Sequence, residues 1–259
     1  MEARSLTTAA FLTLLSWCAP SPVAADQPLD AVRARADHGD AAAQNTLGVI
    51  YAHGIGIPQD AEKAVTWYRK AAEGGSVDAQ ASLGWMYAQG DGVPQDYAEA
   101  VKWTRKAAEH GNAVAQLNLG GMYGTGHGVP QDYAEEVIWY RKAAEQGNMV
   151  AQLGLGSACA SGDGTPQNYT EALKWFRKAA DQGSPLAMDL LGDTYTLGKG
   201  VPQDYVQAHK WYNLAAAKGR PDAGKSRDTV AANMTREQIA EAQKLAREWK
   251  PKPTKRAEK

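Results

Sequence analysis

Cysteine is scarce in this sequence, whose 259 residues contain only Cys18 and Cys159. We expect Cys18 to be removed with the N-terminal segment, so no intramolecular disulfide is predicted for the mature chain. Cys159 occupies a position that holds tyrosine at Tyr51, Tyr87, Tyr123 and Tyr195 in related stretches of the chain. We therefore expect it to be a buried substitute for a core tyrosine. A reactive thiol is disfavoured because no basic residue lies beside it in sequence.

Net charge of one sign is also nearly absent. The 28 Lys and Arg residues are balanced by 29 Asp and Glu, which gives a formal charge of −1. A nucleic-acid-binding protein typically carries an excess of positive charge. The composition is ordinary for a soluble protein and does not suggest nucleic-acid binding.

Established catalytic and metal-binding patterns are missing from the sequence as well. The five histidines fall at different positions of the repeat described below, and no H-E-x-x-H motif or Cys/His cluster occurs. There is also no G-x-S-x-G and no S-x-x-K motif. We therefore predict no catalytic residue, no metal ion and no cofactor.

A long apolar run is confined to the N-terminus. Arg4 provides a basic start, 6–17 is mostly apolar, and Val23-Ala24-Ala25 offers small residues for cleavage. This pattern is typical of a secretory signal peptide over 1–25, with Asp26 as the first mature residue. A membrane anchor is the alternative, but a span needs about 18–20 apolar residues and this run is shorter. We expect export to the periplasm or beyond, with no membrane span after cleavage.

A repeat of 36 residues dominates the rest of the chain. The stretch 79–111 matches the sequence 36 residues before it and 36 residues after it. Leucine, glycine, proline and tryptophan each recur five times at this interval: Leu47, Leu83, Leu119, Leu155, Leu191; Gly48, Gly84, Gly120, Gly156, Gly192; Pro58, Pro94, Pro130, Pro166, Pro202; Trp67, Trp103, Trp139, Trp175, Trp211. A fixed period in this range predicts a stacked repeat protein.

The first half of each repeat is predicted to be a helix, which we name helix A. In the second repeat, Ala79, Leu83, Gly84 and Tyr87 form one helical stripe. Glycine is unfavourable inside a helix, so its recurrence predicts a place where a neighbouring helix comes too close for a side chain. The sequence Gly90-Asp91-Gly92-Val93-Pro94 then ends helix A, because glycine can adopt the left-handed conformation and proline cannot continue a helix.

The second half of each repeat is predicted to be helix B. Asp96 is its expected N-cap, and Glu99 completes a capping box. Helix B buries Ala100, Trp103, Ala107 and Ala108, and a glycine closes each copy. The same capping pair is expected at Asp132 and Glu135, Asn168 and Glu171, and Asp204 and Gln207, whereas the first repeat has Lys63 after Asp60.

This pattern resembles the Sel1-like repeat, a relative of the tetratricopeptide repeat. The resemblance rests on A-x-x-x-L-G-x-x-Y, G-x-G-V-P-Q-D and A-x-x-W-Y/F-R-K-A-A-x-x-G over about 180 residues. It implies an all-α, right-handed α-solenoid that serves as a protein-interaction scaffold, often in bacterial envelopes. Some cysteine-rich relatives were associated with penicillin binding or hydrolysis, but they carry paired cysteines in each repeat, which this chain lacks.

The repeat also defines the expected boundaries. We expect five repeats, at 40–75, 76–111, 112–147, 148–183 and 184–219, after the signal peptide 1–25 and an N-terminal capping half-repeat at 26–39. Capping helices follow at 220–249, and 250–259 forms a disordered basic tail with a formal charge of +4, from five basic residues and one acidic. An open solenoid needs polar terminal units of this kind.

The variable positions of helix A supply the candidate binding residues, because by analogy with tetratricopeptide proteins these positions line the concave face. The candidates are Asn45, Val49, Trp85, Leu117, Leu153, Asp189 and Asp193. Trp85 lies off the core phase of the other repeat tryptophans and is either an interface anchor or packed between adjacent helices A. For the two aspartates the alternative is a solvated surface.

These features predict a monomeric, non-catalytic scaffold that binds another protein or peptide and no nucleic acid. Its expected roles are envelope assembly or the regulation of signalling. Two alternatives stay open. One is a cell-wall or β-lactam-active hydrolase, suggested by the cysteine-rich relatives, and the other is a self-assembling structural element, since open-ended solenoids can stack.

Overall fold

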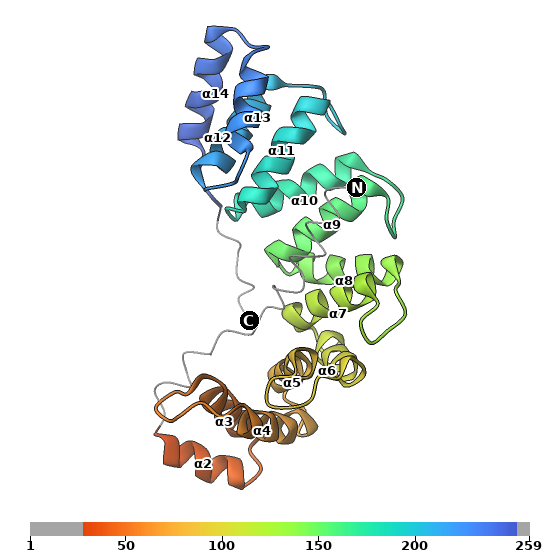
Figure 1. Cartoon of the computed structure of the whole chain (residues 1–259), viewed down its shortest axis with the longest axis vertical. Helices are drawn as coiled ribbons and strands as arrows, with labels where there is room; N and C mark the ends of the chain where they lie inside the picture. Colours follow the sequence, from red (N-terminus) through yellow and green to blue (C-terminus); the bar gives the residue numbers. More distant parts are fainter. Residues whose placement is uncertain (1–27, 253–259) are drawn as a thin grey trace. The chain divides into compact units, whose positions relative to one another are not determined.

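The structure is a computed structural model that describes residues 28–252. The predicted signal peptide, Cys18 and most of the basic tail lie outside the described residues. Within 28–252 the chain forms thirteen α-helices, α2 to α14, and no β-strand, which confirms the all-α prediction (Figure 1). The chain divides between Ala143 and Ala144 into two units, which are described separately below.

The helices alternate as helices A and B. The first unit contains α2 (Leu29–Asp37), α3 (Ala41–His53), α4 (Ala61–Glu73), α5 (Val77–Gln89), α6 (Tyr97–Glu109), α7 (Ala113–Thr125) and most of α8 (Tyr133–Glu145). The second contains α9 (Met149–Ser161), α10 (Tyr169–Asp181), α11 (Pro185–Leu197), α12 (Tyr205–Ala217), α13 (Ala223–Ala231) and α14 (Arg236–Glu248). Odd-numbered helices from α3 to α11 are helices A, and the even-numbered helices from α4 to α12 are helices B.

Each helix A has the termini that its sequence predicts. A polar side chain at the N-cap accepts hydrogen bonds from backbone N–H groups of the first turn, at Asp40, Ser76, Asn112, Asn148 and Ser184. A glycine in the left-handed conformation ends each of these helices, at Gly54, Gly90, Gly126, Gly162 and Gly198. These caps satisfy backbone groups that a helix leaves unpaired at its ends.

The starts of helices B confirm the N-caps and correct the predicted capping boxes. Backbone N–H groups bind the predicted N-cap side chains Asp96, Asp132, Asn168 and Asp204. The carboxylates expected to complete the box accept a hydrogen bond from the indole four residues later: Glu99 from Trp103 at 3.2 Å, Glu135 from Trp139 at 3.0 Å and Glu171 from Trp175 at 3.4 Å. Residues four apart are neighbours on a helix surface, and this spacing makes the indole an available donor. The complete capping box is present at Thr235 and Gln238 of α14.

The recurring helix-A glycines lie where helix B crosses closely, as predicted. A Cβ atom on Gly48 would lie 2.5 Å from the ring of Tyr68, and one on Gly120 would lie 2.6 Å from the ring of Tyr140. In the second repeat, the partner of Gly84 is Thr104 in place of an aromatic ring. The glycine thus makes room for the residue that follows the repeat tryptophan.

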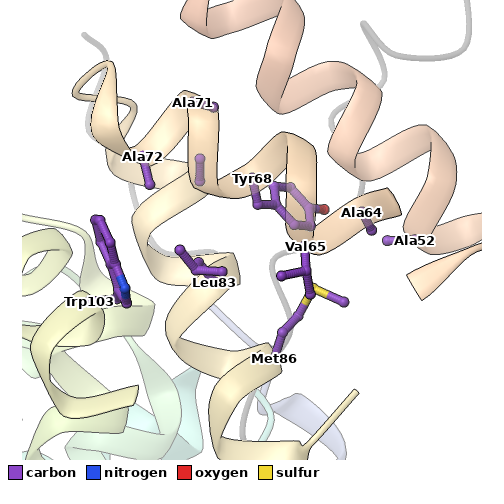
Figure 2. Packing of buried hydrophobic residues seen from close by; sticks show 10 residues of the cluster. Ala52, Ala64, Val65, Tyr68, Ala71, Ala72, Leu83, Met86 and Trp103 are labelled. Carbon is purple, nitrogen blue, oxygen red and sulfur yellow. The ribbon is translucent and has the colours of Figure 1, made fainter. Parts of the chain in front are cut away.

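A core cluster between the first and second repeats shows how stacking buries the helix faces. Tyr68 and Val65 of α4 point toward Met86 and Leu83 of α5, and Trp103 of α6 lies beyond Leu83 (Figure 2). All five are buried. Because residues from successive repeats complete one cluster, a single helix pair would leave these side chains exposed.

A buried glutamine ties each repeat to the helix before it, a feature that the sequence interpretation did not identify. Its side-chain amide donates to a carbonyl near the C-terminus of the preceding helix, as Gln80 does to Ala72 at 3.2 Å. The same bond joins Gln44 to Ala36, Gln116 to Ala108 and Gln152 to Ala144. The recurring Ala-Gln pair is the sequence signal for it, and the fifth repeat has Met188 at this position.

Both ends of the chain carry additional helices. In the first unit, Val32 and Ala36 of α2 pack with Leu47 of α3. In the second unit, α13 and α14 both contact α12, and Trp249 meets the edge of Trp211 with ring centroids 6.0 Å apart. The end of α14 therefore covers the last repeat tryptophan.

Candidate functional site

Three candidate binding residues lie on neighbouring helices A of the first unit. Asn45 and Val49 belong to α3 and Trp85 belongs to α5, and all three are partly exposed. Val49 and Trp85 occupy the same position in successive repeats, and both pack at the margin of the cluster formed by α3 to α6. Trp85 thus combines the two predicted situations, since part of its ring contacts the core and part reaches solvent.

Asn45 adds an unusual polar group to this surface. The residue is partly exposed, yet its side-chain oxygen Oδ1 is buried and has no hydrogen-bond partner. An unsatisfied buried acceptor costs about 1–3 kcal/mol. Rotation of the amide would give that oxygen access to a donor from outside the chain.

Leu117 corrects the predicted surface. Its side chain on α7 is 0 % exposed, so the expectation that it lies on an accessible face is wrong. Ala81, at the equivalent position of α5, is buried as well. In the middle of the first unit this position therefore faces neighbouring helices, and an aliphatic side chain there is removed from water.

The remaining candidates lie in the second unit. Leu153 of α9 is half-buried, and the two aspartates of α11 bind groups of the same chain. The carboxylate of Asp189 pairs with Nε of Arg220 at 2.9 Å, and that of Asp193 accepts a hydrogen bond from the Tyr212 hydroxyl at 2.8 Å. Both contacts join α11 to α12 or to the segment after it, so the aspartates brace the C-terminal end of the second unit.

The environment of Asp193 disfavours its charged form. Partial burial raises the pKa of this carboxyl, and the negative charge of Asp189 raises it further, while the hydrogen bond from Tyr212 and the charge of Arg220 act in the opposite direction. Partial burial also raises the pKa of the Tyr212 hydroxyl. The pair is thus a neutral hydroxyl bound to a carboxylate.

A groove along α10 was not anticipated from the sequence. It has a volume of about 680 Å³ and is lined mostly by α10, with Leu191 and Tyr195 of α11. Its lining includes Lys174, Trp175 and Arg177. The predicted binding residues were chosen on helices A, whereas this groove follows a helix B.

The chemistry of the described residues was searched for other sites. Over residues 28–252, no set of three or more His, Cys, Asp or Glu side chains could hold a metal ion. None of the helices in this range combines the length and apolar character needed to cross a membrane. Cys159 is completely buried, as predicted for a substitute core residue.

His209 of α12 is the histidine with a perturbed environment. It is 3 % exposed and its Nδ1 atom has no hydrogen-bond partner in the described structure. Burial lowers its pKa, and the charge of Arg227 lowers it further, whereas Asp228 has the opposite effect. The folded state therefore favours the neutral ring.

This arrangement predicts that the second unit loses stability in acid. Because the folded-state pKa of His209 lies below the unfolded value of about 6.5, its contribution is present above that pH and declines as the pH falls toward the folded-state value. Chemical denaturation between pH 7.5 and 5 should give a steeper decline for the native protein than for His209→Gln. His110→Gln, on the exposed end of α6, is the matched control and should keep the native slope. An unchanged slope in His209→Gln would contradict the prediction.

The sequence profile of the Sel1 repeat matches residues 41–76, 77–112, 113–148, 150–184 and 185–219. The chain belongs to the Sel1 repeat family. Sel1 repeat proteins generally act as protein-interaction scaffolds, and the alternating helices A and B described above are the repeat units of that fold.

Two solved structures support this assignment. A protective antigen present in uropathogenic Escherichia coli strains, which displays an SLR fold, is 38% identical over 85% of this chain, with a TM-score of 0.78. A Sel1 repeat protein from Oxalobacter formigenes is 37% identical over 78% of this chain, with a TM-score of 0.69. The matches span 48% and 59% of those two proteins, so each is considerably longer than the part that this chain resembles. No curated protein matches the chain significantly.

Proposed function

We propose that this Sel1 repeat protein is an exported, non-catalytic scaffold that binds a polypeptide on the first unit, on the surface formed by Asn45, Val49 and Trp85. We name this the Trp85 surface. The observation that carries the proposal is the position of Trp85, which is half-exposed on a helix A while the tryptophans of the second to fifth repeats are buried on helices B. Partly exposed tryptophans are prominent among interface anchors.

The neighbours of Trp85 suit an extended peptide. Val49 continues the apolar contact onto α3, one repeat away. The amide of Asn45 lies one helical turn before Val49 and has an unused acceptor, which a peptide N–H could satisfy once the amide rotates outward. An apolar anchor beside an unsatisfied acceptor is an arrangement that a polypeptide satisfies with a side chain and a backbone amide.

Export is supported by the sequence of residues 1–25, which has the basic start, apolar run and small residues of a signal peptide. The partner would then be a protein of the periplasm or the extracellular space. Mass spectrometry of the protein purified from cell fractions tests this point. A mature chain that begins at Asp26 in the periplasm or medium supports export, and an intact Met1 chain confined to the cytoplasm contradicts it.

The Trp85→Ala variant is expected to lose binding while keeping its fold. Because Trp85 is only partly buried, its truncation should lower the free energy of unfolding by about 1–2 kcal/mol, below the 3–5 kcal/mol of a core tryptophan. A photocrosslinker at position 45 should recover the same partner from native cells but not from Trp85→Ala cells. Trp67→Ala, another half-buried tryptophan of the first unit, is the control and should keep the crosslink.

Three outcomes would contradict this proposal. A loss of about 3 kcal/mol or more in Trp85→Ala would make Trp85 a core residue. Crosslinks only to other copies of the same chain would favour self-assembly. An equal yield from position 66, which is exposed on α4, would show that the contact is not specific to the Trp85 surface.

A further inference from the structure

The groove along α10 lies entirely within the second unit and has no role in the function proposed above. Its volume of about 680 Å³ falls in the range typical of ligand sites, about 300–1,000 Å³. Its lining on α10 extends from Asn168 to Lys178. Ten residue steps at 1.5 Å correspond to about 15 Å of helix, the length of about five extended residues.

The charged side chains of the groove are mostly positive. Lys174, Arg177 and Lys178 line it, against one acidic residue, Glu171. The Glu171 carboxylate already accepts the indole hydrogen bond of Trp175. Lys174 is exposed and forms no ion pair or hydrogen bond with any of residues 28–252, so its charge is available to a ligand.

The other two cations are held in place by aromatic rings. Lys178 Nζ lies 3.9 Å from the centroid of the Trp175 ring, and the Arg177 guanidinium lies 4.5 Å from that of Trp211. A cation held over a ring keeps hydrogen-bond donors at its edge, so it can receive a carboxylate without a large loss of side-chain freedom. Trp175 and Tyr195 also give the groove aromatic surface.

Further cations flank the two ends of the groove. At the N-terminal end of α10, Lys199 lies over the Tyr169 ring at 5.3 Å, and the Thr170 hydroxyl binds the Gly200 carbonyl at 3.4 Å. At the C-terminal end, the backbone N–H of Lys252 donates to the Asp181 carbonyl at 2.7 Å. The positive charge therefore continues along the whole length of α10.

We propose that this groove binds an acidic peptide segment of about five residues, whose carboxylates meet Lys174, Arg177 and Lys178 and whose apolar side chains contact Trp175 and Tyr195. Charge complementarity selects this occupant. The chain's own tail is unsuitable because 250–259 carries the same sign of charge as the groove. Aromatic and cationic groups also suit single-stranded nucleic acid, but the formal charge of −1 for the chain opposes that class.

The test uses the full mature chain and two fluorescein-labelled peptides of about six residues, one alternating glutamate with leucine and one alternating glutamine with leucine. Fluorescence anisotropy should show binding of the glutamate peptide, weakened severalfold when sodium chloride is raised from low to high concentration. The glutamine peptide should bind at least fivefold more weakly. Lys174→Glu should weaken the glutamate peptide by about tenfold, because an attractive charge becomes a repulsive one.

The matched control is Lys102→Glu, since Lys102 occupies the same repeat position on α6 of the first unit. It should leave peptide binding within about twofold of the native value. Trp85→Ala should also bind the peptide normally, so failure of this proposal and failure of the Trp85 surface are distinguishable. Equal binding of the two peptides, an equal effect of Lys102→Glu and Lys174→Glu, or tighter binding of a labelled oligothymidylate than of the peptide would each overturn the proposal.

Discussion

Replacing Gly128 by alanine is expected to lower the free energy of unfolding of the first unit by about 3 kcal/mol or more. Gly128 has a φ of +74°, a conformation that strains any residue with a Cβ atom. A Cβ atom there would also overlap the carbonyl group of Tyr97, the first residue of helix B in the preceding repeat. Because these atoms belong to the backbone, no side-chain rotation can relieve the overlap.

Gly56 provides a matched control for that substitution. It occupies the same position in the first repeat and has a φ of +71°, but a Cβ atom on it would meet nothing within 4 Å. Gly56→Ala should therefore show only the cost of the backbone conformation, about 1–2 kcal/mol. Urea denaturation followed by circular dichroism compares the two variants. Equal losses would show that the close approach between repeats contributes nothing, and would contradict the prediction.

This contrast shows which features the repeat period specifies. A 36-residue period places equivalent residues in equivalent settings, so helix boundaries and the close approach of Gly48 to Tyr68 follow from it. The period cannot distinguish a repeat with a neighbour from one without. Gly56 and Gly128 are identical in sequence terms, and they differ because only the second has a complete preceding repeat beneath it.

The candidate binding residues were harder to predict for the same physical reason. The burial of Leu117 depends on how closely α7 approaches its neighbours, a lateral distance that periodicity does not encode. The pair Asp189 and Arg220 joins residues 31 positions apart, across the point where the repeat pattern ends. Arg220 belongs to no repeat position, so no pattern could have assigned it a partner.

The groove along α10 illustrates a second limit. Lys174 has an equivalent in Lys102, and Trp175 in Trp103, so the local sequence is not distinctive. Lys102 forms an ion pair with Glu99 at 2.9 Å, whereas Lys174 forms none within the described part of the chain. The difference arises from side-chain placement, which similar local sequences leave undetermined.

Trp211 is the repeat tryptophan whose loss should destabilise the second unit most. It is 0 % exposed, whereas Trp67 of the first repeat is only half-buried. Its ring contacts Trp249 from the end of α14, and the cations of Arg177 and Lys210 lie 4.5 Å and 4.6 Å from its centroid. One side chain thus holds α10, α12 and the C-terminal helix together.

Trp211→Ala is therefore expected to lower the free energy of unfolding of the second unit by about 3–5 kcal/mol, and Trp67→Ala to lower that of the first unit by about 1–2 kcal/mol. Hydrogen exchange read by mass spectrometry can assign each loss to its unit, and α14 should lose protection in Trp211→Ala. Protection retained in α14 would contradict the bridging role of this ring.

A further variant separates the ring of Trp211 from its polar group. In α6, α8 and α10 a glutamate accepts the indole hydrogen bond, but the fifth repeat has Gln207 at that position and the Nε1 atom of Trp211 is buried without a partner. Trp211→Phe removes this unsatisfied donor and keeps most of the ring contact. It should therefore lose less than half of what Trp211→Ala loses, because an unpaired buried donor costs about 1–3 kcal/mol and offsets the smaller ring. Equal losses in the two variants would show that Nε1 has a partner in solution, such as an ordered water molecule.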